Sequence, residues 1–499
     1  MKLWLVDHAY KYAAEQIMLT QFPGERPEYP DTPAPKRADM EENSAVLKIT
    51  RSGRGARATA TICRGGKTAR SFASAGAEEP CDKLGEDRAL QRILKSAFYR
   101  AAVKLTGTRS QWGSLTGIRP GKIAARLIKG GMTDKETVRY MMREYDASPA
   151  RAKLCVDAAK AGIDAERTLR ERDIALYIGI PFCPTRCAYC SFVSIGVERS
   201  FALIDPFLDA LYREIDAVSR IVNDLNLNVV SVYIGGGTPT TLDETQLDVL
   251  LKKLAGAFDL SSVRDYTVEA GRPDTITAEK MAALYENGVG RVSINPQTMR
   301  DDVLRAIGRK HTAADIVTAV RTARDAKMGI INMDLIAGLP EDTVSGFKYT
   351  LDAVLELRPE NVTVHTLALK KGSRITLEKT AIPGAEEVGD MLSYAQDRLT
   401  KSEFSPYYLY RQKFTAGGFE NTGWSKKGYE NLYNICIMEE LRSIIALGGG
   451  GSTKLVDPKT GRIERVFNAK YPLEYIENIE KCIARKGEIA KFYNECQFG

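Results

Sequence analysis

The chain has 499 residues, of which 44% are hydrophobic and 27% are charged, with a formal net charge of +7. This composition is typical of a soluble globular protein and excludes a fibrous or low-complexity chain. A single core rarely grows beyond about 300 residues, so we expect two or three domains. No apolar run reaches the ~18 residues of a membrane span, and the first residues lack a signal-peptide pattern. We therefore expect a cytoplasmic protein with no membrane span.

Residues 1–168 are predicted to form a basic N-terminal α+β module. Its expected strands are 45–50 and 57–63, and its expected helices are 87–105 and 122–128. Residues 88–133 contain ten basic residues and no acidic one. Such a basic face can attract an anionic substrate or nucleic acid, although it is more often a solvated helix surface. Because the module lacks an RNA-recognition signature and has few interleaved aromatic residues, nucleic acid is not expected as a partner.

Residues 169–383 show a different pattern, in which short apolar runs alternate with amphipathic segments. The predicted strands are 175–180, 229–234, 266–269, 291–294, 330–336 and 361–365. The predicted helices between them are 206–221, 242–257, 277–287, 313–327 and 343–357. This alternation predicts an α/β fold, a partial and open (β/α)6 barrel whose site lies at the carboxyl ends of its strands. Residues 384–499 are expected to form a helix-rich C-terminal domain that closes the substrate pocket.

Nine cysteines and three histidines limit the kinds of site that the chain can build. An odd number of cysteines in a long intracellular chain argues against a disulfide framework. Six of the cysteines are scattered, and isolated buried cysteine is their default interpretation. With so few histidines, a His-rich zinc or non-haem iron site is not expected.

The other three cysteines form a triplet directly after the first predicted barrel strand. Cys183, Cys187 and Cys190 have the spacing Cys-x3-Cys-x2-Cys. Thiolates are the usual ligands of iron–sulfur clusters, and three of them leave one iron of a four-iron cluster open. That iron can chelate the amino and carboxylate groups of S-adenosylmethionine (SAM), whose reductive cleavage gives a 5′-deoxyadenosyl radical. A zinc loop is the alternative, but structural zinc prefers four ligands and no fourth Cys or His lies nearby.

With these motifs the chain resembles the oxygen-independent coproporphyrinogen III oxidases (coproporphyrinogen dehydrogenases) of the radical SAM superfamily, and above all their HemZ-type branch. The resemblance covers about residues 173–499, and the N-terminal module and residues 408–413 match the HemZ-type branch in particular. The motifs that carry it are Tyr177-x-x-Ile-Pro-Phe-Cys183, the glycine run Gly235–Thr240, Glu269, Gln297, Ile307-Gly-Arg309-Lys-His311 and Asp334-Leu-Ile-Ala-Gly-Leu-Pro340.

The resemblance implies a 4Fe-4S cluster on the cysteine triplet and two bound SAM molecules. The residues that match contacts of the first SAM are Tyr177, Gly236 and Glu269. The residues that match the surroundings of the second are Tyr189, Gly237, Thr238, Gln297, Arg309, Asp334 and Ala368. Tyr177, Glu269 and Arg309 are the candidate catalytic residues. The chemistry agrees in part, because a carboxylate at a strand end can accept ribose or ammonium hydrogen bonds and an arginine can bind a carboxylate with two parallel bonds.

The implied activity is that of a radical SAM oxidoreductase in anaerobic haem (porphyrin) biosynthesis. The radical would take hydrogen from propionate β-carbons of coproporphyrinogen III, and loss of CO2 and one electron would give the vinyl groups of protoporphyrinogen IX. The expected partners are this anionic tetrapyrrole and a flavodoxin- or ferredoxin-like reductant. Arg309, Lys310 and the basic N-terminal module are candidates for binding the substrate carboxylates.

Two positions depart from the pattern of the well-studied oxidases. Gly179 stands where they carry His, and Phe192 stands where they carry a fourth Cys that is not a cluster ligand. Because both positions lie close to the substrate chemistry, two alternatives stay open. One is another radical SAM reaction on a tetrapyrrole, such as methyl transfer or ring opening. The other is a haem-binding or trafficking protein, for which His365 is the one histidine at a predicted barrel-strand end.

Overall fold

The structure is a computed structural model that describes residues 1–496 with gaps at 54, 77–82, 191–194, 197–200, 371–372, 379 and 413–414. Phe192, Lys413 and Cys81 lie outside the described residues. The chain divides into two compact units, Met1–Val156 and Asp157–Gly499. Within the described part, every helix is too short or too polar to cross a membrane.

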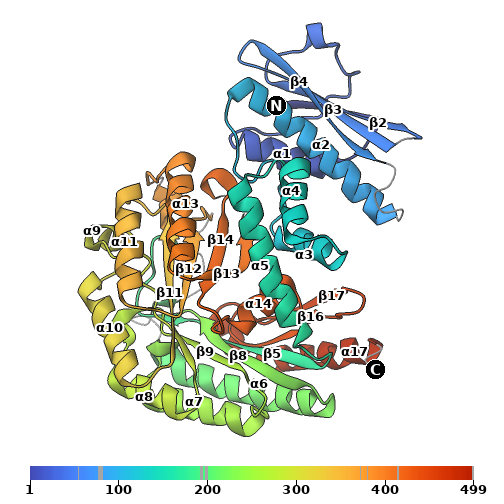
Figure 1. Ribbon diagram of the computed structural model, residues 1–499. Coiled ribbons are helices and arrows are strands. Elements are labelled where there is room, and N and C mark those ends of the chain that lie inside the picture. The colour runs from blue at the N-terminus through green and yellow to red at the C-terminus, as the bar shows by residue number, and fades with distance from the viewer. Residues whose placement is uncertain are drawn as a thin grey trace. The chain divides into compact units, whose positions relative to one another are not determined.

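The first unit is a four-stranded sheet packed against helices (Figure 1). Its strands are β1 (Lys2–Val6), β2 (Ser44–Ser52), β3 (Gly55–Arg64) and β4 (Lys67–Gly76), with β1 parallel to β2 and the other pairs antiparallel. Its helices are α1 (Lys11–Gln21), α2 (Lys83–Thr106), α3 (Gly121–Lys129) and α4 (Asp134–Tyr145). Ala45, Leu47 and Ile49 are buried whereas Lys48 and Thr50 are exposed. This period-two alternation places one face of the sheet on the core formed with α1 and α2.

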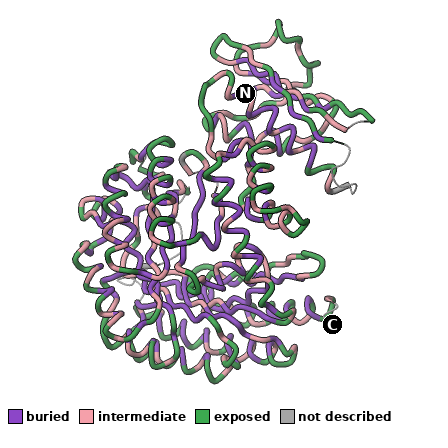
Figure 2. The backbone as a smooth tube through the Cα atoms, in the orientation of Figure 1, coloured by how far each residue is buried: buried purple, intermediate pink, exposed green. Residues whose placement is uncertain are grey.

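The second unit contains the predicted row of six parallel strands. They are β5 (Asp173–Ile180), β8 (Asn228–Gly236), β9 (Asp265–Glu269), β10 (Arg291–Ser293), β11 (Ile330–Ala337) and β12 (Asn361–Thr366), and they lie side by side in chain order. Their residues are almost all buried, as strands covered on both faces require (Figure 2). The predicted α/β fold with a partial (β/α)6 barrel is therefore confirmed.

Crossover helices follow the strands and cover the outside of the sheet (Figure 1). They are α6 (Ile204–Asp224), α7 (Glu244–Ala257), α8 (Ala278–Glu286), α10 (Ala313–Asp325) and α11 (Val344–Glu356), with the short α9 (Asp301–Ala306) before α10. Polar caps fix where they begin. Asp243 and Gln246 form a reciprocal capping box on α7, and Thr312 and Asp315 form another on α10. Each box satisfies backbone N–H groups at the helix start and so ends the preceding loop at a defined residue.

The C-terminal region is helix-rich, as predicted, and it also extends the sheet at both edges. Its helices are α13 (Ala385–Lys401), α14 (Leu432–Glu439), α15 (Pro472–Glu477), α16 (Ile479–Arg485) and α17 (Gly487–Glu495). At one edge β14 (Glu420–Ser425) pairs antiparallel with β12, followed by β13 (Ser405–Arg411). At the other edge β15 (Ile444–Gly448) pairs parallel with β5, followed by β16 (Ser452–Val456) and β17 (Ile463–Phe467). These five strands were not predicted.

A buried ion pair fastens the C-terminal helices to the barrel. Lys486 lies 3.1 Å from Glu214 of α6, and both side chains are fully buried. Glu214 also accepts hydrogen bonds from the Gly448 backbone N–H at 2.8 Å and the Tyr475 hydroxyl at 2.6 Å. Because a buried charge is tolerated only when it is paired and hydrogen-bonded, this cluster holds the turn after β15 in one position.

Candidate active site

A cavity of about 480 Å³ lies toward the carboxyl ends of the barrel strands. Every residue that the sequence assigned to the cluster, to SAM or to catalysis lines it, and the structure therefore brings all of them together. They are Cys183, Cys187, Cys190, Tyr177, Tyr189, Gly236, Gly237, Thr238, Glu269, Gln297, Arg309, Asp334 and Ala368. Sequence reasoning did not assign several other lining residues, among them Tyr233, Arg272, Asn332 and Tyr433.

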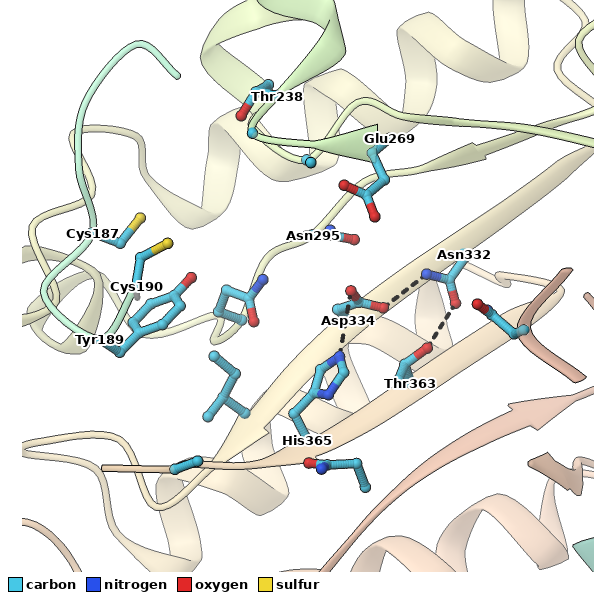
Figure 3. A pocket seen from close by; sticks show the side chains of 18 of the residues that line it. Cys187, Tyr189, Cys190, Thr238, Glu269, Asn295, Asn332, Asp334, Thr363 and His365 are labelled. Carbon is cyan, nitrogen blue, oxygen red and sulfur yellow. Dashed lines mark hydrogen bonds and ion pairs between the residues drawn. The ribbon is translucent and has the colours of Figure 1, made fainter. Parts of the chain in front are cut away.

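The three cysteines come from the loop that starts at β6 (Phe182–Cys183), which pairs with β7 (Ile195–Gly196). The Cys190 N–H donates to the Cys187 carbonyl at 3.1 Å, which closes a tight turn. Figure 3 shows the side chains of Cys187 and Cys190 pointing the same way. Among the described residues, no three His, Cys, Asp or Glu side chains converge closely enough to hold one metal ion. All three cysteines line the cavity, and thiolates are the usual ligands of iron–sulfur clusters.

The glycine run at the end of β8 packs closely against its neighbours. A Cβ atom on Gly237 would lie 2.4 Å from the Phe182 carbonyl oxygen, and one on Gly235 would lie 2.9 Å from the Glu269 carboxyl carbon. The Gly237 N–H donates to the Ile180 carbonyl at 2.8 Å, and the Thr238 N–H donates to the Phe182 carbonyl at 2.7 Å. Only glycine leaves room here for the backbone of the cysteine loop. The predicted approach of the glycine backbone to SAM would be a second reason for glycine at these positions.

Glu269 ends β9 inside the cavity. Burial raises the pKa of its carboxyl group to about 7, although the hydrogen bond from Tyr233 acts in the opposite direction. The Tyr233 hydroxyl donates that bond at 2.6 Å, and its ring stacks on Tyr433 with centroids 4.5 Å apart. Tyr177 stacks on Tyr433 at 6.0 Å. A carboxyl group whose pKa lies near neutrality can change its hydrogen-bonding role at physiological pH.

A polar network occupies β11 and β12 on the opposite wall (Figure 3). Asn332 donates to one Asp334 oxygen at 2.8 Å, and the His365 Nε2 atom lies 3.6 Å from the other. Asn332 in turn accepts from the Thr363 hydroxyl at 3.2 Å. Burial alone would raise the pKa of Asp334, but the bond and charge of His365, with Asn332 and Thr363, lower it overall. The network therefore keeps Asp334 ionised and fixes its orientation.

Arg309 is buried and contacts the cysteine loop through Tyr189. It donates to the Asn295 carbonyl at 2.7 Å, the Gly271 carbonyl at 3.2 Å and the Tyr189 hydroxyl at 3.2 Å. Two backbone carbonyls and one tyrosine hydroxyl thus hold the guanidinium within the protein, and its bidentate pairing with a ligand carboxylate stays a prediction. The Nε atom of Arg309 and the Oε1 atom of Gln297 are buried and have no hydrogen-bond partner among the described residues.

These features fit a cluster and SAM. Three thiol groups from one loop can hold the cluster, and buried polar atoms without a partner, on Gln297 and Arg309, suit a polar ligand. Glu269 ends β9, whereas Asp334 lies within β11 and not at its end as the sequence predicts. Both carboxylates line the cavity and can accept hydrogen bonds from the hydroxyl and ammonium groups of SAM.

Comparisons with known proteins agree with this chemistry. Residues 177–354 match the Radical SAM superfamily. The chain is 39% identical over 380 residues to the oxygen-independent coproporphyrinogen-III oxidase-like protein HemZ of Bacillus subtilis, covering 75% of this chain and 76% of that protein. It is 27% identical over 305 residues to the heme chaperone HemW of Haemophilus influenzae, covering 61% and 76%. The solved structure of coproporphyrinogen III oxidase (HemN) from Escherichia coli matches the fold with a TM-score of 0.51 and 24% identity, over 65% of this chain and 72% of that one.

The barrel and its cysteine-lined cavity define a radical SAM protein, for which a 4Fe-4S cluster and SAM are the implied cofactors. Within that superfamily, the chain belongs to the family of oxygen-independent coproporphyrinogen-III oxidase-like proteins. The resemblance found in the motifs is therefore confirmed.

Proposed function

We propose that the protein is a radical SAM oxidoreductase that converts propionate side chains of coproporphyrinogen III to vinyl groups. The observation that carries the proposal is that one cavity is lined by the cysteine loop, by the residues assigned to SAM from the sequence and by several tyrosines. Each propionate would lose a hydrogen atom from its β-carbon, then CO2, and then one electron that passes to an external acceptor. We propose a cytoplasmic location and a flavodoxin- or ferredoxin-like protein as the electron donor.

The residues near the cysteine loop would bind the cofactors. Cys183, Cys187 and Cys190 are the proposed cluster ligands. When bound, the cluster and SAM supply a 5′-deoxyadenosyl radical that can take hydrogen from carbon. Glu269, with Tyr177 and Gly236, would orient this SAM. The Tyr233 hydroxyl would keep the Glu269 carboxylate pointing at it, since their hydrogen bond is only 2.6 Å long.

A second SAM is proposed next to the first. The residues assigned to it, which include Gln297, Arg309, Asp334 and Ala368, line the same cavity. The buried Oε1 of Gln297 and Nε of Arg309 would gain hydrogen-bond partners from such a ligand. Asp334, kept ionised by His365 and Asn332, would accept bonds from it.

The substrate would occupy the end of the cavity formed by the C-terminal region. Tyr408, Tyr410, Tyr433, Ile437 and Met438 line that end. Aromatic and apolar side chains suit the face of a tetrapyrrole and exclude water from the reacting carbon. The imidazole of His365 is 30% exposed and lines the cavity, where a ring N–H could donate a hydrogen bond to a propionate.

The test is anaerobic incubation of the reconstituted protein with coproporphyrinogen III, SAM, dithionite and an electron acceptor, followed by mass spectrometry. We expect a product lighter by one CO2 and two hydrogens per propionate. Cys187→Ala should abolish it, whereas Cys63→Ala, in the first unit, should leave it unchanged. SAM cleavage without any loss of mass from the tetrapyrrole would contradict the proposal, and a gain in mass would favour methyl transfer.

A haem-binding role is the second candidate. It is favoured by the similarity to HemW, which is described as a heme chaperone, and by the presence of His365 on the cavity wall. Titration of the protein with haem would test it. A shift of the Soret band that His365→Phe removes would support haem binding in this cavity, and an unchanged haem spectrum would contradict it.

A further inference from the structure

We propose that Arg272 is a positioning residue for the iron–sulfur cluster. Its side chain anchors the loop between Cys183 and Cys187, and its contact with the Cys187 sulfur raises the reduction potential of the cluster. This inference deepens the proposed function but rests only on the cluster. It does not depend on which substrate the cavity takes.

Arg272 is fixed by its own backbone before it reaches the loop. It follows β9 and directly precedes a short 3-10 turn, Pro273–Thr275. Its carbonyl accepts from the Thr275 N–H at 3.0 Å and from the Thr275 hydroxyl at 2.8 Å. The side chain is 3% exposed, so the guanidinium is shielded from water and its N–H groups need hydrogen-bond acceptors from the protein.

The hydrogen-bond acceptors of Arg272 lie at two different edges of its guanidinium. The Nη1 atom donates to the Thr185 hydroxyl at 2.8 Å, to the Thr185 carbonyl at 3.3 Å and to the Cys187 Sγ atom at 3.8 Å. The Nε and Nη2 atoms donate to the two oxygens of Asp274 at 3.1 and 3.2 Å. One edge of the guanidinium thus holds the cysteine loop while the other edge is held by a carboxylate.

This orientation gives the sulfur a net positive field. The guanidinium lies between Cys187 and Asp274, and Asp274 is 31% exposed, so water screens its charge more than that of the buried arginine. Hydrogen bonds and positive charge near a ligand sulfur favour the reduced state of a cluster, because reduction adds one electron to it. Radical SAM chemistry requires that reduction before SAM can be cleaved.

The charged and titratable neighbours of Arg272 and Asp274 do not cancel the positive field at the Cys187 sulfur. His311 lies 3.9 Å from Asp274, and burial, with the charge of Arg309, lowers the pKa of its imidazole to about 4. His311 is therefore neutral at physiological pH. Arg309, which donates to the Gly271 carbonyl and to the Tyr189 hydroxyl, adds a second positive charge.

The test uses the full-length protein with a reconstituted cluster and no tetrapyrrole, so that its failure is distinguishable from failure of the proposed substrate. Arg272→Gln removes the charge, and Asp274→Asn removes the carboxylate that partly neutralises it. Anaerobic titration with dithionite, followed by electron paramagnetic resonance of the reduced cluster, gives the potential. We expect Arg272→Gln to make the one-electron reduction roughly tenfold less favourable, equivalent to about −59 mV, and Asp274→Asn to shift the potential upward.

Arg300→Gln is the matched control, because Arg300 pairs with Asp302 two residues later through the same Nε and Nη2 edge but does not line the cavity. It should leave the potential and the iron content unchanged. Shifts of the same sign in Arg272→Gln and Asp274→Asn would indicate a merely loosened loop and overturn the proposal, as would two unchanged potentials. If Arg272→Gln binds no iron while Arg300→Gln does, the anchoring of the cysteine loop by Arg272 is supported. The sign of the potential shift in Asp274→Asn then decides whether the arginine raises the potential.

Discussion

Glu269 is the residue whose protonation state most directly links the site to pH. Its ordinary pKa of 4.5 is raised to about 7 by burial. Below about pH 4.5 the carboxyl group is protonated in both the folded and the unfolded chain. Between that pH and about 7 the unfolded chain releases the proton while the folded chain keeps it. The stability that this group contributes is therefore lost as the pH rises through this window.

Glu269→Gln should remove this dependence. We expect the variant without cofactors to have the same free energy of unfolding as the parent near pH 5 and to be more stable by on the order of 2 kcal/mol near pH 8. Denaturant titrations at the two pH values measure the difference. Glu286→Gln, an exposed change, is the control and should behave like the parent. A gain for Glu269→Gln that is equal at both pH values would contradict the explanation.

Tyr233→Phe should raise the pKa of the Glu269 carboxyl group further. The Tyr233 hydroxyl stabilises the carboxylate form of Glu269, so its loss raises the pKa of Glu269, by about one unit if the bond is worth 1–2 kcal/mol. SAM binding that needs ionised Glu269 should then reach half its maximum at higher pH, which equilibrium dialysis across pH can measure. Tyr433→Phe keeps the ring stack and should leave the midpoint in place. Equal shifts in both variants would argue against a role for the Tyr233 hydrogen bond.

At the scale of elements, the joint between β15 and β5 depends on Gly448. Its φ is +82°, and a Cβ atom there would lie 2.2 Å from the Gly179 carbonyl oxygen. Gly461 has a similar φ of +73° but open space around it. The two positions therefore separate backbone strain, which both share, from steric overlap, which only Gly448 has.

Gly461→Ala should cost about 1 kcal/mol of unfolding free energy, and Gly448→Ala should cost at least about 3 kcal/mol because rigid backbone must also move. Gly448→Ala should in addition lower the iron bound after reconstitution, since β5 leads into the cysteine loop. Denaturant unfolding and iron analysis measure both effects. Equal costs for the two variants would show that the close approach to Gly179 is unimportant.

The elements also show which patterns a sequence reveals. The six barrel strands were predictable because they are short apolar runs between amphipathic helices. β14 was missed because Asn421, Thr422 and Ser425 are buried in it, with Asn421 accepting from the Thr366 N–H at 2.7 Å. Such polar residues look like a loop until their partners are known.

The residues of the site also fall into those that the sequence reveals and those that it does not. Residues in spaced motifs, such as the cysteine triplet, could be named from the sequence. Tyr233, Arg272 and Asn332 could not, because a single tyrosine, arginine or asparagine has no characteristic spacing and acquires its role only through tertiary contacts with Glu269, Cys187 and Asp334.

At the scale of the whole molecule, α5 (Pro149–Arg167) spans the division between the two compact units. Its second half belongs to the second unit, where Ala161 and Ala165 pack against the cluster formed by Tyr407, Tyr408 and Ile435. The sequence predicts domains of residues 1–168, 169–383 and 384–499. A boundary at 168 would assign this helix to the N-terminal module.

Two fragments test that boundary. Residues 149–499 keep all of α5, whereas residues 173–499 leave its packing surface on Tyr407 and Ile435 exposed. We expect the shorter fragment to melt at a lower temperature and to be cut faster by protease, because burial of apolar surface is lost. Thermal denaturation followed by circular dichroism measures this. Identical melting temperatures would instead favour the boundary at 168.

The close contact between β5 and the glycine run after β15 has a consequence for engineering. A Cβ atom on Gly179 would lie 2.7 Å from the Gly449 carbonyl oxygen. Any side chain introduced at residue 179 therefore requires the turn that follows β15 to shift. Substitutions at Gly179 and in that turn should be non-additive, because the two segments share one contact.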